Sequence, residues 1–188
     1  MTFFNTHIKH RSGLAALAWA LASGSACAGT GLTWANASDM LALGLPALAA
    51  GSTWAKSDLE GFKQLNWTMV TTVGAAEVLK TSVHSMRPDG SDNKSFPSAH
   101  TAVAFAAVRY MDKRYGAEVA EYRPLLYAAA ALTGVARVEA DKHHWRDVVA
   151  GGALGWGAAH YWSQPIQGGQ LSVLPAAGGL AVAWGRAW

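Results

Sequence analysis

The apolar positions of this chain recur with a helical period along most of its length. Five such stretches are each long enough for a helix, and short polar or turn-forming segments separate them. The pattern predicts an all-α fold, a bundle of about five core helices. We expect these helices over residues 40–55, 59–86, 98–115, 124–138 and 144–162. Ser98 is placed to cap the third helix, and Pro124 suits the first turn of the fourth.

Turn-forming residues mark the ends of the predicted helices. The cluster at 88–93 separates the second and third helices, because its Pro, Gly, Asp and Asn residues cannot continue either one. Near the C-terminus, two apolar runs at 171–174 and 180–184 flank a turn rich in Pro, Ala and Gly. We expect a short β-hairpin there, or an extended segment that covers the bundle.

Residues 1–28 have the pattern of a signal peptide: a basic lead, a short apolar core at 13–22 and small residues before the end. We expect cleavage after Ala28, export to the periplasm and a single domain over 29–188. An uncleaved membrane anchor is the alternative, although the apolar core is shorter than the ~20 residues that a spanning helix needs. Cys27 is the only cysteine, so a mature chain would hold no disulfide.

Composition adds limits on the class of protein. With 51% hydrophobic and 14% charged residues over 188 positions, a disordered chain is excluded. A net charge of +3 is too small to identify an anionic partner.

The apolar stretches are mostly too short to span a bilayer, and Lys80 and Arg137 interrupt them, which favours a periplasmic globular domain. A membrane-embedded bundle stays open, because the fifth helix carries small residues typical of membrane packing: Gly151, Gly152, Gly155 and Gly157.

Three short polar clusters, in a fixed order, carry the chemistry of this chain. Together they supply three cations, two imidazoles and one carboxylate. Converging Arg and Lys donors hold an anion whose charge is spread over several oxygens, and a positioned nucleophile can attack it. This inventory suits a phosphate group, and nothing in the sequence points to nucleic acid or to a redox cofactor. The clusters are Lys80 with Arg87, residues 97–100, and Arg137 with His143 and Asp147.

The third cluster contains a candidate nucleophile. His143 and Asp147 are four residues apart, so both lie on one face if the fifth helix begins near His143. The carboxylate would then accept the proton of one imidazole nitrogen and leave the other nitrogen free to attack. His144 is the rival, because its spacing of three to Asp147 is also helical. The structural alternative is a His–Asp pair that only caps a helix.

The order and spacing of the three clusters resemble the type 2 phosphatidic acid phosphatase superfamily. This superfamily includes class A bacterial acid phosphatases, lipid phosphatases and vanadium-dependent haloperoxidases. The resemblance covers about residues 80–147, the motif core of the expected domain. It implies a metal-independent phosphohydrolase without a cofactor, in which a histidine forms a phosphohistidine intermediate. The family's spacing of five residues between Arg137 and that histidine selects His143 over His144.

The resemblance also implies roles for the remaining cluster residues. His100 would be the general acid that protonates the leaving oxygen, and Asp147 would steer His143. The backbone amides at the start of the third helix, around Ala99, would add donors for the anion. Alternatively, the cations form structural ion pairs with Glu77, Glu139 or Asp141. The implied phosphate-binding residues are Lys80, Arg87, Ser98, Ala99 and Arg137.

The chain departs from the family pattern at two positions: Ala136 stands where a Ser is usual, and Ala99 where a Gly is usual. Three other readings stay open. They are a vanadium-dependent haloperoxidase with His143 as the vanadate ligand, a zinc site built from the histidines and Asp147, and a catalytically silent module that binds lipid headgroups. The expected substrate is a phosphorylated lipid or a small phosphomonoester, with membrane-surface association open and the oligomeric state not set by the sequence.

Overall fold

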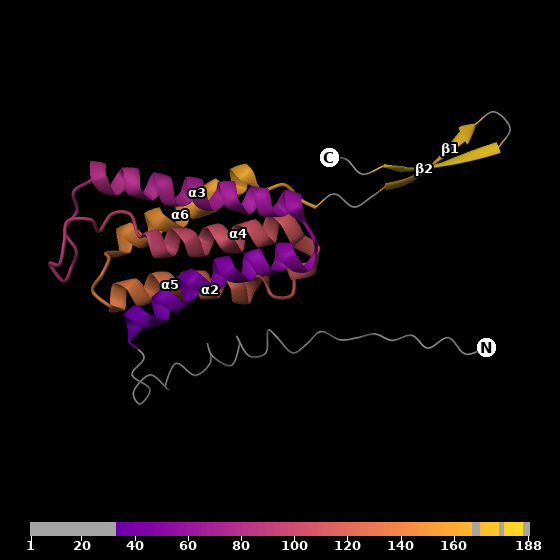
Figure 1. Cartoon of the computed structure of the whole chain (residues 1–188). Helices are drawn as coiled ribbons and strands as arrows, with labels where there is room; N and C mark the ends of the chain where they lie inside the picture. The colour runs from indigo at the N-terminus through magenta and orange to yellow at the C-terminus, as the bar shows by residue number, and fades with distance from the viewer. Residues whose placement is uncertain (1–32, 167–169, 177–178, 186–188) are drawn as a thin grey trace, which may run out of the picture.

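A computed structural model describes residues 33–166, 170–176 and 179–185 of the chain. In this described part the chain forms five helices packed side by side, with α2, α4 and α6 running in one direction and α3 and α5 in the other (Figure 1). The all-α bundle predicted from the apolar pattern is therefore confirmed. The expected signal peptide, residues 1–28, lies outside the described residues. The helices are α2 Trp34–Ala55, α3 Leu59–Ser82, α4 Ala99–Val119, α5 Arg123–Glu139 and α6 Trp145–Trp162.

Local capping explains where the helix ends differ from the predicted ones. α2 begins at Trp34 rather than near Met40, because the Thr33 hydroxyl accepts a hydrogen bond from an amide of the first turn. α3 ends at Ser82, short of the predicted Met86, because the backbone of the next residue is already extended. Apolar periodicity indicates which face of a helix is buried, whereas capping contacts determine the residues at which the helix begins and ends.

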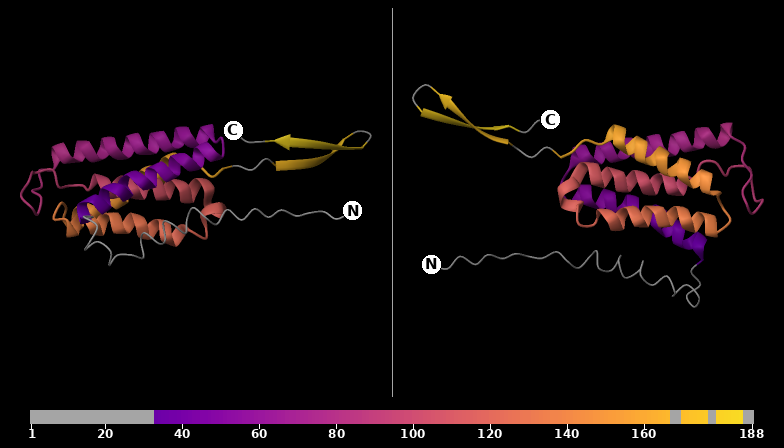
Figure 2. Two further views of the ribbon diagram at one scale, coloured as in Figure 1. Left: turned by 60° about the horizontal axis from the view of Figure 1, so that its bottom comes forward. Right: turned by 180° about the vertical axis from the view of Figure 1, so that it is seen from behind.

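Helix α4 is the centre of the bundle. It packs against all four other helices, and Figures 1 and 2 show it between the pair α3 and α6 and the pair α2 and α5. Alanines dominate its buried positions, and their small side chains let the neighbouring helices approach on every side. The buried apolar residues of α4 are Ala102, Ala104, Ala106, Ala107, Val108, Tyr110, Met111 and Tyr115.

Two glycines of α6 bring its backbone against the start of α4. A Cβ atom added at Gly151 would lie 2.3 Å from the carbonyl oxygen of Ser98. One added at Gly155 would lie 1.9 Å from the carbonyl oxygen of Ala102. Any side chain would overlap with backbone at both positions. The second and third turns of α6 are therefore held at backbone contact distance from the start of α4, which fixes the spacing of the residues that precede the two helices.

We expect Gly155→Ala to destabilise the protein by ~1–3 kcal/mol, because the new methyl group meets backbone that cannot move without separating α4 from α6. Gly157→Ala is the matched control, since nothing lies within 4 Å of its added Cβ and alanine is the better helix former by ~1 kcal/mol. Urea unfolding of both variants measures the free energies. A Gly155→Ala protein as stable as wild type would contradict the proposed contact.

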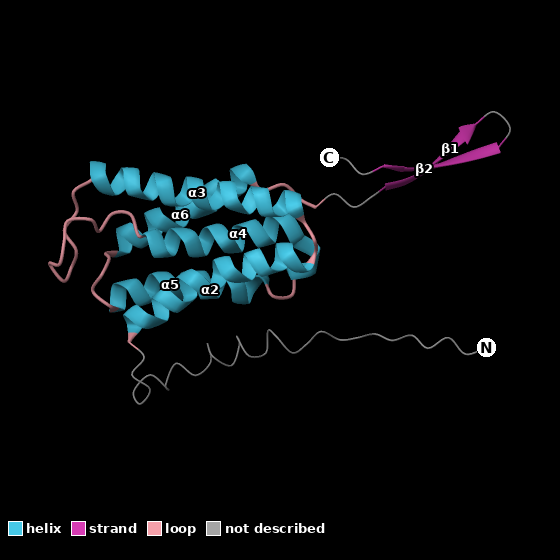
Figure 3. Ribbon diagram, in the orientation of Figure 1, coloured by secondary structure: helices cyan, strands magenta, loops and turns pink. Residues whose placement is uncertain are grey.

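Beyond the bundle, β1 (Gln170–Ala176) pairs antiparallel with β2 (Gly179–Gly185), at the position where the sequence predicts a hairpin (Figure 3). In the register of this pair, Gln170 lies opposite Gly185 and Ala176 lies opposite Gly179.

Several helices carry large apolar side chains on their outer surfaces. Within the described ranges, however, none of the helices combines the length and the apolar character that a membrane span requires. At the end of the bundle where α2, α4 and α6 begin, the exposed apolar residues are Trp34, Met40, Leu43, Val78, Val83, Met86, Trp145 and Val149.

Candidate active site

The antiparallel packing brings the three predicted clusters to one end of the bundle, which we call the site end. Here α2, α4 and α6 begin and α3 and α5 end (Figure 1). The loop of residues 83–98 joins α3 to α4, and the loop of residues 140–144 joins α5 to α6. Residues that are far apart in the sequence therefore become neighbours at the site end.

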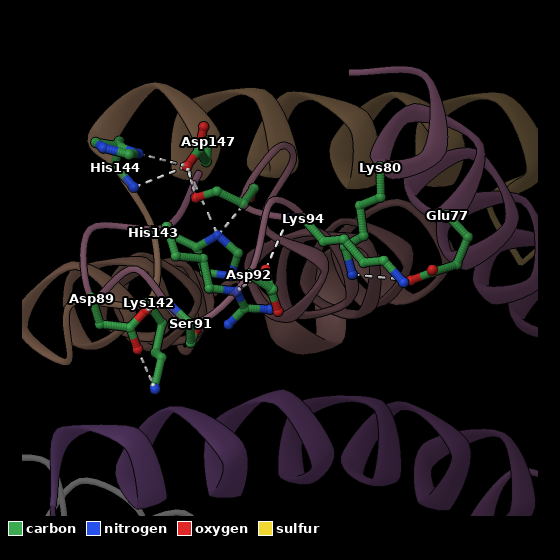
Figure 4. A network of polar contacts seen from close by, with 12 residues as sticks. Glu77, Lys80, Asp89, Ser91, Asp92, Lys94, Lys142, His143, His144 and Asp147 are labelled. Carbon is green, nitrogen blue, oxygen red and sulfur yellow. Dashed lines mark hydrogen bonds and ion pairs between the residues drawn. The ribbon is translucent and has the colours of Figure 1, made fainter. Parts of the chain in front are cut away.

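The two loops are joined to each other by hydrogen bonds. The backbone amide of Asp89 donates to the carbonyl oxygen of Asp141 (3.1 Å), and Lys142 Nζ donates to the Asp89 carboxylate (2.6 Å). A φ of +70° at Gly90 lets the first loop turn tightly, with the Gly90 amide bonded to the carbonyl of Arg87. These contacts place Arg87 on the same side of the bundle as the α5–α6 loop, as Figure 4 shows for Asp89 and Lys142.

His143 is buried and has a defined tautomer. Its Nδ1 lies 2.7 Å from the carbonyl oxygen of Ser95. Because a carbonyl oxygen only accepts hydrogen bonds, Nδ1 carries the proton, and a neutral ring keeps its lone pair on Nε2. Burial, with the nearby charge of Arg137, lowers the pKa of His143 to about 4. The imidazole is therefore neutral in mildly acidic and neutral solution, as a nucleophile must be.

Asp147 contacts His143 less directly than the spacing predicts. Its Oδ2 lies 3.9 Å from His143 Nδ1, too far for a hydrogen bond. The expected contact is wrong because α6 begins at Trp145, so His143 precedes the helix and does not lie on its face. Oδ2 instead accepts hydrogen bonds from the Ser95 hydroxyl and from the His144 amide. Ser95 thus joins the carboxylate to the imidazole.

The charge of Asp147 is maintained despite its complete burial. Burial alone would raise the pKa of this carboxyl, but the hydrogen bonds from Ser95 and from the His144 backbone lower it below its ordinary value. The backbone carbonyl of Asp147 also accepts the amide of Ser98 (3.0 Å). One residue therefore connects the start of α6 with the start of α4.

His144, the rival of His143, lies on the other side of Asp147. Its side chain is 41% exposed, and its Nδ1 lies 3.3 Å from Asp147 Oδ2. Figure 4 shows the two imidazoles pointing in different directions. His144 lines a cavity of about 580 Å³ together with Val83, His84, Ser85, Met86, Phe96 and Arg146.

Arg137 is the most buried of the three predicted phosphate-binding cations. Its Nη1 lies 3.3 Å from the Ser38 hydroxyl and 3.5 Å from the Asp39 carboxylate. Its Nε is buried and has no hydrogen-bond partner among the residues that the structure describes. A buried unpaired donor is costly, and an anion oxygen would satisfy it.

Lys80 and Arg87 also have carboxylate partners. Lys80 bonds Glu77 (3.0 Å), as the structural alternative expects. Arg87 bonds Asp92 (2.8 Å) instead of the acidic residues at the C-terminal end of α5. The carboxylate partners of the three cations are 41–57% exposed, whereas the cation side chains are 7–18% exposed. Ion pairs with such exposed partners contribute little to stability, so a ligand anion can replace them.

At the start of α4, Ser98 has only one of its two expected roles. Its side chain caps the helix by accepting from the Thr101 amide, which confirms the predicted cap. Its own amide, however, donates to Asp147, and its fully buried hydroxyl lies 3.0 Å from Thr101 Oγ1. Neither group of Ser98 is thus directed to a phosphate. The amides of Ala99 and His100 are left as the candidate donors of this helix end.

His100 is half-buried, and its Nε2 lies 2.9 Å from the Asp39 carboxylate. Burial and the charges of Arg137 and Lys80 lower the pKa of His100, while Asp39 opposes this change. Arg137 also acts on His143, together with Arg87. The predicted cations and imidazoles therefore share one electrostatic environment at the site end.

Sequence reasoning missed two residues of this network, Ser95 and Asp39. Ser95 belongs to none of the three sequence clusters, and its contact with His143 is made by a backbone carbonyl, which any residue type could supply. Asp39 had a signal: it is the only charged residue of α2. A single charge in an apolar helix calls for a partner.

A zinc site would need a close group of ligand side chains. In the portion of the chain that the structure describes, no three His, Cys, Asp or Glu side chains are grouped so that they could hold a metal ion.

The chain matches known proteins over the region that carries the site. The family model described as "PAP2 superfamily" matches residues 89–168, which include His100, Arg137, His143 and Asp147 but not Lys80 or Arg87. The lipid A 1-phosphatase of Porphyromonas gingivalis is 36% identical over 91 residues, which are 47% of this chain and 20% of that protein. Lipid phosphate phosphatase 1 of Arabidopsis thaliana is 34% identical over 34% of this chain and 23% of its own length.

The chain thus spans about a fifth to a quarter of these two relatives. The lipid A 4'-phosphatase of Helicobacter pylori is 27% identical over 63% of this chain and 64% of its own length. The crystal structure of a transmembrane PAP2 type phosphatidylglycerolphosphate phosphatase from Bacillus subtilis aligns with a TM-score of 0.39 and 20% identity, over 79% of this chain and 90% of that one. Residues 89–168, which hold most of the candidate site, thus match the PAP2 superfamily, and the relatives of this chain include named lipid phosphatases.

Proposed function

We propose that this chain is a metal-independent phosphohydrolase that cleaves a lipid phosphomonoester through a phosphohistidine on His143. The observation that carries the proposal is the state of His143: a buried, neutral imidazole whose tautomer leaves Nε2 unprotonated, close to Arg137 and Arg87. A neutral nitrogen nucleophile beside cations suits attack on an anionic phosphorus centre.

In the first step, Lys80, Arg87 and Arg137 bind the phosphate oxygens, and the amides at the start of α4 add donors. Nε2 of His143 attacks phosphorus in line with the leaving oxygen, so an N–P bond forms as the P–O bond to the lipid breaks. His100 donates its proton to the leaving oxygen, and the lipid alcohol departs.

In the second step, water hydrolyses the phosphohistidine. His100, now neutral, accepts a proton from the attacking water, the N–P bond breaks, and inorganic phosphate is released. The starting protonation states are restored. Asp147 stabilises the positive charge that His143 carries in the intermediate, at 3.9 Å and through the Ser95 hydrogen bonds.

Two observations support a lipid as the substrate. The relatives include proteins named lipid A 1-phosphatase and lipid phosphate phosphatase. Apolar side chains also surround the polar site end: Val83, Met86 and Phe96 line the cavity beside His144, and Met40 and Leu43 are exposed on α2. A phosphate held by cations beside an apolar rim suits a headgroup with acyl chains. We further propose that the protein is exported to the periplasm and acts at a membrane surface.

The test measures phosphate release by the purified protein from phosphatidic acid in detergent micelles, with glycerol 3-phosphate as the matched substrate without acyl chains. We expect kcat/KM for the lipid to be at least ~10-fold higher, since burying two methylene groups is enough for such a ratio. EDTA should leave the rate unchanged, and vanadate should inhibit it. No phosphate release, or a rate that depends on added metal, would contradict the proposal.

A further inference from the structure

Asp39 lies against two groups of the proposed site, although it belongs to none of the three sequence clusters. Its Oδ1 is 2.9 Å from His100 Nε2 and 3.5 Å from Arg137 Nη1. It is the only charged residue of α2, and its side chain is 53% exposed. One carboxylate oxygen from a third helix thus contacts a residue of α4 and a residue of α5.

We propose that Asp39 is a positioning residue that holds the His100 imidazole by Nε2 and favours the charged form needed for proton donation. This inference rests on the proposed function, because it gives a role to the partner of the general acid. A carboxylate only accepts hydrogen bonds when ionised, so the contact requires a proton on Nε2. The leaving oxygen would then take its proton from Nδ1 of the charged ring, while Nε2 keeps its hydrogen bond to Asp39.

The charges around His100 make such a partner necessary. Arg137 on α5 and Lys80 on α3 both disfavour a positive imidazole, and burial, the largest effect, acts in the same direction. α6 places its carboxylate, Asp147, against Ser95 and the His144 backbone. Asp39 opposes these effects by its charge and its hydrogen bond, and so raises the pKa of His100 relative to a site without it.

A structural role alone does not explain Asp39. Exposed ion pairs contribute little to folding, so removing this charge should leave the stability nearly unchanged. Asp39→Asn is an informative substitution, because the amide oxygen can still accept from Nε2 while the negative charge is lost. The variant therefore separates the charge from the shape of the side chain.

The experiment follows the His100 imidazole of the full chain by NMR during a pH titration, with the signal assigned from its loss in His100→Gln. In Asp39→Asn we expect the titration midpoint to move to lower pH. In parallel, kcat/KM on the alkaline limb of the pH profile should fall roughly 3- to 10-fold, with little change at lower pH. Glu121→Gln is the control, because Glu121 is exposed in the turn between α4 and α5, far from the site end.

The outcomes separate this inference from the proposed function. An unchanged His100 midpoint in Asp39→Asn would overturn the inference even if the enzyme is a phosphatase. An equal shift in Glu121→Gln would also overturn it, because the effect would then be a general one of net charge. A wild-type protein without phosphatase activity would contradict the proposed function, while the NMR titration would still decide whether Asp39 sets the charge of His100.

Discussion

His143→Ala is expected to abolish phosphate release, with kcat lower by at least ~10³-fold. The substitution removes the Nε2 lone pair that forms the N–P bond, and the remaining cations can bind phosphate but cannot attack it. Initial rates with phosphatidic acid measure the loss. Rapid quenching of wild-type enzyme with ³²P-labelled substrate should also trap label in an acid-labile bond, and the variant should trap none.

His144→Ala is the matched control, since it removes an adjacent imidazole that also contacts Asp147. Its ring is 41% exposed and points in a different direction from His143, so we expect activity within a few-fold of wild type. Label found on His144, or full turnover by His143→Ala, would show that the nucleophile is assigned to the wrong residue.

His100→Ala should lower the rate with an alkyl phosphate by ~10²- to 10⁴-fold, the usual effect of losing a general acid. An alkoxide is a poor leaving group without a proton, whereas nitrophenolate departs unaided. The loss should therefore be much smaller with p-nitrophenyl phosphate. Comparing kcat for the two substrates in wild type and variant measures this difference.

An equal loss with both leaving groups would contradict proton donation and would assign His100 to binding. His160→Ala provides the imidazole control, because His160 lies at the opposite end of α6 and stacks on Trp156. We expect its ratio of rates for the two substrates to match that of wild type.

The fold could be predicted from the sequence because burial follows the apolar period. In α4, the periodic alanines and the cap at Ser98 both point to the same helix, and the structure has it at Ala99–Val119. The start of α2 could not be placed, because it depends on a single hydrogen bond from Thr33. Such a contact leaves no trace in the apolar pattern.

The site could be predicted only as a set of clusters. Their order and spacing indicated which cations and imidazoles meet, and antiparallel packing brings them together. The partners of His143 and His100 could not be predicted in the same way. The Ser95 carbonyl has no side-chain signature, and Asp39 reaches His100 only because α2 packs against α4 and α5.

The backbone contact between α6 and α4 at Gly151 and Gly155 limits how far the site can be reshaped. It fixes the distance between His143, the proposed nucleophile just before α6, and His100, the proposed general acid in the first turn of α4. Accommodating a bulkier lipid by moving these helices would disrupt the reacting geometry itself. Substrate range should therefore be altered through the exposed apolar side chains of Met40, Leu43, Val83 and Met86, which lie at the site end without setting that distance.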